Sequence, residues 1–178
     1  EFFANPTSTI NFHGDHNAVL PAKPGNYEKP LQNVIFSGNG AKTITANVFS
    51  VKGYVQIENG SHLTNTNRDF YIGGNFIDQN TTTTGYTKGT SRVIFNGTDR
   101  QNINILTDAD FYNLKIDNSA GVDVTNGGTA TNNVIVSNIM TLTNGNFITS
   151  SDALIALTNT SENAISGGGE SSFVDGPL

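Results

Sequence analysis

Short apolar segments recur along the second half of this chain at intervals of about 20 residues, and this spacing restricts the possible folds most strongly. The segments begin, at nearly equal spacing, at Val93, Leu114, Val134, Leu154 and Phe173. A looser series of the same kind begins at Val34, Val55 and Tyr71. Such a period, with two or three short strands per repeat, is typical of a β-solenoid, in which each turn of the chain stacks on the previous one.

Alternation within these segments predicts which side chains face the interior. In the segment Leu114–Ile116 the central Lys115 carries a charge and is expected to face water, so its two neighbours point into the core. Gln56 gives the same prediction for Val55 and Ile57. The composition agrees, because 25 Asn, 22 Thr and 19 Gly residues favour strands and turns over helices. We therefore expect an all-β chain.

The glycine-rich stretch from Val34 to Thr43, VIFSGNGAKT, has the look of a phosphate-binding loop. Its spacing is wrong for that motif because Ala41, not Gly, precedes Lys42. A similar stretch, VIFNGTDRQN, begins further along the chain at Val93 and lacks the Lys-Thr pair. Both copies are therefore interpreted as a strand and a turn of a repeating fold.

Asparagine directly precedes three of the apolar segments, at positions Asn33, Asn113 and Asn133. Equivalent asparagines in successive turns of a solenoid can stack and form hydrogen bonds with one another. This placement predicts an incomplete asparagine ladder.

Two segments interrupt the pattern. Residues 13–33 contain Pro21, Pro24 and Pro30 and are predicted to be an inserted loop, and residues 81–91 are predicted to be a polar loop. The remainder of residues 1–178 is expected to form one continuous solenoid of eight or nine turns. Because the chain starts without Met and ends abruptly at Leu178, it is interpreted as a fragment of a longer protein.

Candidate metal ligands are few. The sequence HGDH places His13 and His16 on either side of Asp15, fewer ligands than a zinc site needs. Asp108 and Asp110 are weak candidates for calcium, which binds six to eight oxygen atoms. Exposed, solvated turns are the favoured interpretation of both groups, so no cofactor is expected, and calcium is the one weak alternative.

Carbohydrate contacts and catalysis are the other options for a solenoid surface. Exposed aromatic rings are common in glycan sites, and Tyr27, Tyr54 and Tyr86 are the candidates for such contacts. Glycoside hydrolysis needs two carboxylates at a defined separation, and no acidic pair lies one turn apart in equivalent strands. The chain is therefore not expected to be an enzyme, although a polysaccharide-binding or polysaccharide-degrading β-helix is the alternative function.

Charge and hydropathy limit the possible partners. The formal charge of −6 and the scattered positions of nine basic residues argue against nucleic-acid binding. No apolar run approaches the length of a membrane-spanning helix, about 20 residues.

The order of several motifs resembles repeat modules of large secreted surface proteins of Bacteroidota. The motifs are VIFNGTDRQNINI, FYNLKIDNSAGVDV, MTLTNGNFI and SSFVDGPL, and the resemblance covers Ser91 to Leu178 well and Val34 to Phe76 more loosely. It implies a right-handed parallel β-helix within a cell-surface adhesin or gliding-motility protein exported by the type IX secretion system. A rigid extracellular spacer or adhesion module is then the expected function. Its expected partners are a cell surface, a polysaccharide or other protein chains of the same assembly.

Overall fold

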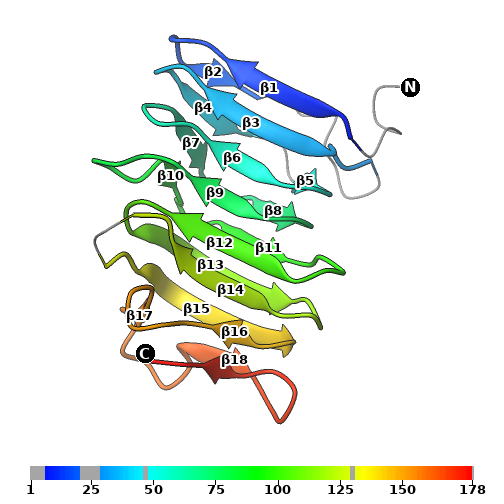
Figure 1. Cartoon of the computed structure of the whole chain (residues 1–178), viewed down its shortest axis with the longest axis vertical. Coiled ribbons are helices and arrows are strands. Elements are labelled where there is room, and N and C mark those ends of the chain that lie inside the picture. Colours follow the sequence, from blue (N-terminus) through cyan, green and yellow to red (C-terminus); the bar gives the residue numbers. More distant parts are fainter. Residues whose placement is uncertain (1–6, 21–28, 46–47, 129–130, 178) are drawn as a thin grey trace.

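The chain forms a β-solenoid of about seven turns, with about 23 residues in each turn. The computed structural model describes residues 7–20, 29–45, 48–128 and 131–177, and no helix occurs among them. Figure 1 shows the strands stacked along one axis, with β1 at one end of the stack and β18 near the other. Neighbouring strands of the described sheets are parallel, because each turn brings the chain back in the same direction. The expected β-solenoid is confirmed.

The longest sheet, called sheet A here, runs the full length of the stack. In spatial order its strands are β1 (Thr9–His13), β3 (Asn33–Ser37), β6 (Val55–Ile57), β9 (Phe76–Asp78), β12 (Gln101–Ile105), β14 (Val122–Asn126), β16 (Phe147–Ile148) and β19 (Val174–Asp175). Each described turn contributes one strand to this sheet, so sheet A is the common face of the solenoid.

Two further sheets close the turns. Sheet B consists of β2 (Ala18–Val19), β4 (Ala41–Ile44), β7 (His62–Asn65) and β10 (Tyr86–Thr87). Sheet C consists of β5 (Val48–Val51), β8 (Asp69–Ile72), β11 (Arg92–Phe95), β13 (Ala109–Asp117), β15 (Val134–Asn144), β17 (Ile155–Leu157) and β18 (Ile165–Gly167). Sheet B ends at β10, after which two sheets enclose the core.

The residues that replace sheet B are the first halves of the long strands β13 and β15. The ring of Tyr86 in β10 lies 5.6 Å from the ring of Phe111 in β13, so the interior position of sheet B continues into sheet C. A register shift between Phe111 and Asn113 marks the place where earlier turns have a corner. The corner has become a bend within one strand.

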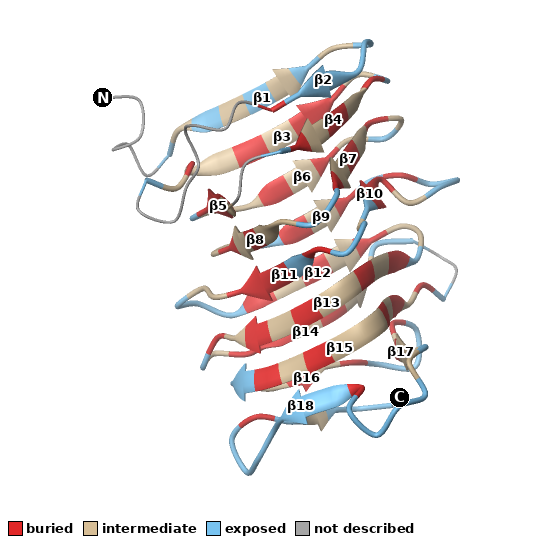
Figure 2. Cartoon of the chain, turned by 180° about the vertical axis from the view of Figure 1, so that it is seen from behind, coloured by how far each residue is buried: buried red, intermediate tan, exposed pale blue. Residues whose placement is uncertain are grey.

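The core consists of one continuous apolar column. Strands alternate buried and partly exposed residues, a pattern visible as red and tan bands in Figure 2. Leu114 and Ile116 are fully buried while Lys115 faces outward, as the sequence predicts. Val55 and Ile57 are likewise buried on either side of Gln56. The inside and outside assignments made from alternation are confirmed for these segments.

The spacing of turns is less regular than the sequence suggests. The interval between Val34 and its partner Val55 is short, whereas the interval between Phe76 and its partner Ile103 is among the longest in sheet A. The predicted pairing of Val93 with Leu114 is confirmed.

The apolar segment at Val134 does not follow Leu114 in the stack. Val134 pairs with Ala109, and Leu114 pairs with Met140, which lies beyond Val134 in the sequence. The predicted period of about 20 residues is too short because it matches Leu114, in the second half of β13, with Val134, in the first half of β15. About seven turns, not eight or nine, result from the longer period.

The two VIF copies occupy different sheets. The copy at Val34 lies in β3 of sheet A, and the copy at Val93 lies in β11 of sheet C. Both are strands followed by turns, as predicted, but they are not equivalent positions of the repeat. The common tripeptide reflects a shared requirement for buried β-branched and aromatic side chains.

The predicted asparagine ladder is wrong for the three residues that suggested it. Asn33 begins β3 in sheet A, whereas Asn113 lies within β13 in sheet C. Asn113 does accept a hydrogen bond of 2.8 Å from Asn138 one turn later, and Asn133 Oδ1 is buried without a partner. A coil-to-coil amide contact therefore exists at Asn113, but its partner is Asn138 and not another of the three predicted residues.

Both segments predicted as loops contain parts of the solenoid. Residues 13–33 include the end of β1, all of β2 and the buried Leu31, which bridges to Val51. Pro21 and Pro24 lie outside the described residues. Residues 81–91 include β10, which pairs with β7. The polar residues before β10 form the turn between sheets A and B, and those after it form the turn between sheets B and C.

Candidate functional site

The amino group of Lys42 is enclosed by backbone carbonyl groups. Lys42 points inward from β4 and is 1% exposed. Its Nζ donates to carbonyl oxygens of Ser37 and Gly40 (2.6 Å each), Gly14 (2.9 Å) and Gly38 (3.1 Å). Burial lowers the pKa of this amino group, and Asp15 partly opposes the shift. Lys42 therefore links two successive turns through backbone carbonyl groups.

A second buried polar cluster lies one to two turns further along the same corner. Asp78 accepts hydrogen bonds from the backbone N–H of Gly85 (2.7 Å) and from the side chain of Asn80 (2.8 Å). Asn80 in turn donates to the carbonyl of Ser61 (3.1 Å). Burial raises the pKa of Asp78, and the hydrogen bonds from Asn80 and Gly85 and the charge of His62 oppose the rise. Asp78 and Asn80 are almost fully buried, so this cluster stabilises the turn from inside.

The calcium candidates lie at the start of β13, where other groups already occupy them. Asp108 accepts a hydrogen bond of 2.7 Å from the backbone N–H of Asn133. Asp110 forms an ion pair with Lys88 and accepts a hydrogen bond of 2.7 Å from Ser137. A lysine ammonium at Asp110 competes with a bound cation. Among the residues that the structure describes, no group of three or more His, Asp or Glu side chains could hold a metal ion.

The histidine pair does not gather ligands either. His13 Nδ1 lies 2.9 Å from the hydroxyl of Ser37, and Asp15 accepts a hydrogen bond of 3.0 Å from the backbone of Asn39. These contacts cross from the first turn to the second, so they contribute to stacking.

The predicted glycan contact is wrong for Tyr86. Its ring is buried between Phe76 and Phe111, and its hydroxyl lies 3.0 Å from that of Ser91. Burial raises its pKa to about 12. Tyr54 is partly exposed, with its hydroxyl 3.4 Å from Thr9 Oγ1. Tyr27 lies outside the described residues.

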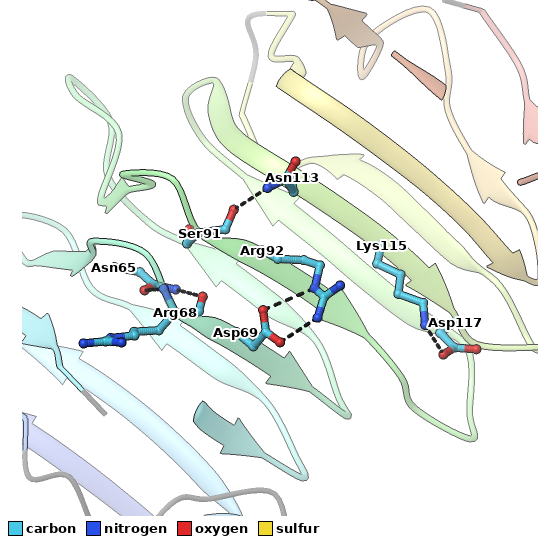
Figure 3. A network of polar contacts seen from close by, with 8 residues as sticks. All are labelled: Asn65, Arg68, Asp69, Ser91, Arg92, Asn113, Lys115 and Asp117. Atoms are coloured by element: carbon cyan, nitrogen blue, oxygen red, sulfur yellow. Dashed lines mark hydrogen bonds and ion pairs between the residues drawn. The ribbon is translucent and has the colours of Figure 1, made fainter. Parts of the chain in front are cut away.

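The outer face of sheet C carries a band of paired polar side chains, shown in Figure 3. Arg92 donates two hydrogen bonds to Asp69 in the preceding turn, at 2.6 and 3.2 Å. Lys115 pairs with Asp117 on its own strand at 2.8 Å. Because a carboxylate accompanies each of these two cations, this part of the face is polar but locally neutral.

The outer face of sheet A carries a groove of about 510 Å³. It crosses β14 and β16 and draws its lining from three successive turns. The lining includes Arg100, Asp123, Thr125, Asn126, Thr131, Ile148 and Asp152. Such a volume is within the range of small-molecule and oligosaccharide sites. The groove is open to solvent along the surface of the solenoid.

Arg100 and Asp123 form one end of this groove. Arg100 Nε and Nη2 donate to the two carboxylate oxygens of Asp123 at 2.7 and 2.9 Å. The pair raises the pKa of Arg100, with a further contribution from Asp175. Because a guanidinium carries five N–H donors and two are used here, the pair presents both donors and acceptors to the groove.

The other end of the groove is fixed by the turn after β14. Asn126 Oδ1 accepts hydrogen bonds of 2.9 Å from Gly128 N–H and from Asn132 Nδ2. Asn126 Nδ2 donates to the carbonyl of Asp152 in the next turn at 3.3 Å. These contacts hold the rim in place.

The sequence carries a signal for this groove that simple motif reading misses. Few residues separate the paired positions Val34 and Val55 in sheet A. Where more residues separate two paired positions, the additional residues lie in the connections between strands. The interval from Val122 to Phe147 is longer, and so is the one after Phe76, which contains Arg100. Comparing these intervals locates both rims once the strand pairing of sheet A is known.

Comparisons with known proteins do not assign the chain to a family. No protein-family model, no curated protein and no solved structure matches the chain. No helix in the described part of the chain is long and apolar enough to cross a membrane.

Proposed function

We propose that this chain is a rigid structural segment of a large extracellular surface protein, where it serves as a spacer or adhesion module without enzymatic activity. The observation that carries the proposal is the uninterrupted stack of sheet A, in which eight strands from β1 to β19 pair in parallel. Such a stack has one direction and little freedom to bend, which are the mechanical properties that a spacer needs.

The interior supports this role. Stacked side chains such as Phe49 and Phe70, whose ring centroids are 5.5 Å apart, connect successive turns. Buried polar groups add contacts between turns, as Lys42 does from β4 to Gly14. A repeat protein gains stability from each interface between neighbouring repeats, so this arrangement resists local opening along the whole stack.

The proposal includes the export route, the cellular location and the partners of the chain. The motifs from Ser91 onward resemble modules of secreted Bacteroidota proteins, so we propose export by the type IX secretion system and display on the cell surface, in an adhesin or a gliding-motility protein. The partners would be the cell surface, a polysaccharide or other chains of the same assembly. Antibodies raised against the chain should label intact cells that produce the native protein, and labelling only after cell lysis would contradict surface display.

Rigidity can be measured directly, because the chain contains no cysteine. Spin labels on His16→Cys and Glu170→Cys, both exposed and near opposite ends, report the distance across the stack. Seven turns at about 4.8 Å each give a rise of about 35 Å along the stack, so a rigid chain predicts a single narrow distribution at or above that distance, because the two sites also lie at different corners of the solenoid. A broad or multiple distribution would contradict a rigid spacer.

A further inference from the structure

We propose that the groove on the outer face of sheet A binds a segment of a neutral polysaccharide. The site extends from the ion pair of Arg100 and Asp123 at one end to Asn126, Thr131 and Asp152 at the other. Of the tyrosines that the sequence suggests for glycan contacts, the two that the structure describes, Tyr54 and Tyr86, do not line it. The inference goes beyond the spacer role and does not depend on it.

The chemistry of the lining matches sugar hydroxyl groups. The paired guanidinium and carboxylate of Arg100 and Asp123 are 54% and 30% exposed, so they combine donors and acceptors at a fixed spacing. Amide and hydroxyl groups of Asn126 and Thr131 continue the polar surface. Ile148 supplies an apolar element between them, against which the C–H face of a sugar ring can pack.

The charge of the region selects among polysaccharides. No Lys or Arg follows Lys115 in the sequence, whereas Asp117, Asp123, Asp152, Glu162, Glu170 and Asp175 do. Arg100 is the cation that lines the groove, and its charge is offset by Asp123 while Asp152 lies at the opposite rim. An acidic polymer would therefore meet like charges, so a neutral chain is the favoured ligand.

The chain offers a matched control for this site. Arg92 and Asp69 form a second bidentate pair on the outer face of sheet C, with the same separation in sequence as Arg100 and Asp123. Their side-chain exposures, 47% and 32%, are close to those of Arg100 and Asp123. Neither residue lines the groove, so removing this pair changes surface charge in the same way without changing the proposed site.

The test measures binding of neutral hexasaccharides (glucan, mannan, xylan and galactan types) and of an acidic hexasaccharide, oligogalacturonate, to the whole chain by isothermal titration calorimetry. We expect saturable binding of at least one neutral oligosaccharide and weaker or no binding of the acidic one. Asp123→Asn and Arg100→Gln should each weaken binding about tenfold, the effect of one charged hydrogen bond. Asp69→Asn and Arg92→Gln should leave the affinity unchanged.

Three outcomes would overturn the proposal: no saturable binding to any neutral oligosaccharide, preference for the acidic one, or equal losses in the groove variants and the control variants. Circular dichroism of each variant shows whether it is folded before binding is compared. A chain that fails this test but passes the distance measurement would remain a spacer without glycan affinity.

Discussion

The turns from β1 to β11 surround their core with three sheets, whereas the turns from β12 onward use two, and the difference comes from a few residues at one corner. In the three-sheet part, Asn65 closes the corner between β7 and β8 by bonding to both the N–H and the carbonyl of Arg68, at 3.1 and 3.0 Å. In the next turn Gly89, with a positive φ of 51°, makes the corresponding corner.

The two-sheet part has no such turn in β13. Residues Phe111 to Leu114 stay in strand conformation, and the register shift at Asn113 absorbs the change of direction. The comparison teaches that turn-forming residues decide locally whether a third sheet exists, while the apolar column inside continues unchanged.

The largest expected effect tests whether the two parts share one core. Ile116→Asp in the two-sheet part and Val55→Asp in the three-sheet part each place a charge at a position that is 0% exposed. We expect a loss of about 4 kcal/mol or more in either case, with unfolding of the whole chain, because the column is continuous. Urea denaturation followed by circular dichroism measures it.

Thr141→Asp is the control for that prediction, because Thr141 faces outward beside Lys115. It should change the free energy of unfolding by less than about 0.5 kcal/mol. If Val55→Asp left the two-sheet part folded, the two parts would be separate cooperative units.

Lys42→Met should destabilise the three-sheet part through the loss of its carbonyl contacts. Several backbone oxygens would lose a buried donor, for an expected cost of about 3 kcal/mol. Lys115→Met, which removes the partly exposed ion pair to Asp117 in the two-sheet part, should cost less than about 1 kcal/mol. Chemical denaturation of both variants measures the difference, and similar costs would contradict a special role for Lys42.

The corner itself is tested by Asn65→Ala. Asn65 is 0% exposed, and its amide forms both hydrogen bonds of the corner, so we expect a loss of about 2 kcal/mol. Asn113→Ala, at the bend in β13, should cost less than about 1 kcal/mol, since its side-chain hydrogen bonds with Asn138 and Ser91 are only partly buried and link neighbouring turns instead of closing one. Equal losses would mean that the bend depends on Asn113 as much as the corner depends on Asn65.

The smallest effect is a difference in pH dependence between two carboxylates. Burial raises the pKa of Asp78 in the three-sheet part, so its contribution to stability is present below pH 3.8 and is lost as the pH rises through its folded pKa. The hydrogen bond from Lys115 lowers the pKa of Asp117, so its contribution is present above pH 3.8 and is lost as the pH falls through its folded pKa.

Comparing each Asp→Asn variant with the parent chain between pH 7 and pH 3 isolates the two contributions. On acidification the parent should gain stability relative to Asp78→Asn and lose it relative to Asp117→Asn. Denaturation midpoints at each pH provide the measurement, and slopes of the same sign for both variants would contradict the assignment.

Alternation and composition are sufficient to predict the solenoid class and the inward residues of short strands, because one polar side chain between two apolar ones fixes the facing of all three. They do not fix which strand stacks on which, since β13 and β15 each contain two apolar segments that look like separate strands. The shorter period predicted from the sequence follows from that ambiguity.

The groove could not be predicted from sequence motifs either. Its residues come from three separate turns, and Arg100 belongs to a longer interval between strands of sheet A. Tyr86 illustrates the opposite error, because a tyrosine in a polar segment suggests exposure, yet the pairing of β10 with β7 turns its ring into the core. Burial of an individual side chain depends on pairing that the sequence does not display.

The most direct test of this account is disulfide trapping between adjacent strands of the cysteine-free chain. The structure pairs Lys115 with Thr141, whereas the period predicted from the sequence pairs it with Ile135, and all three side chains face outward. Neighbouring parallel strands bring Cα atoms within the range that a disulfide spans. Lys115→Cys/Thr141→Cys should oxidise rapidly and completely in the folded chain, and Lys115→Cys/Ile135→Cys should not. The reverse result would contradict the register shift and with it the two-sheet part of the solenoid.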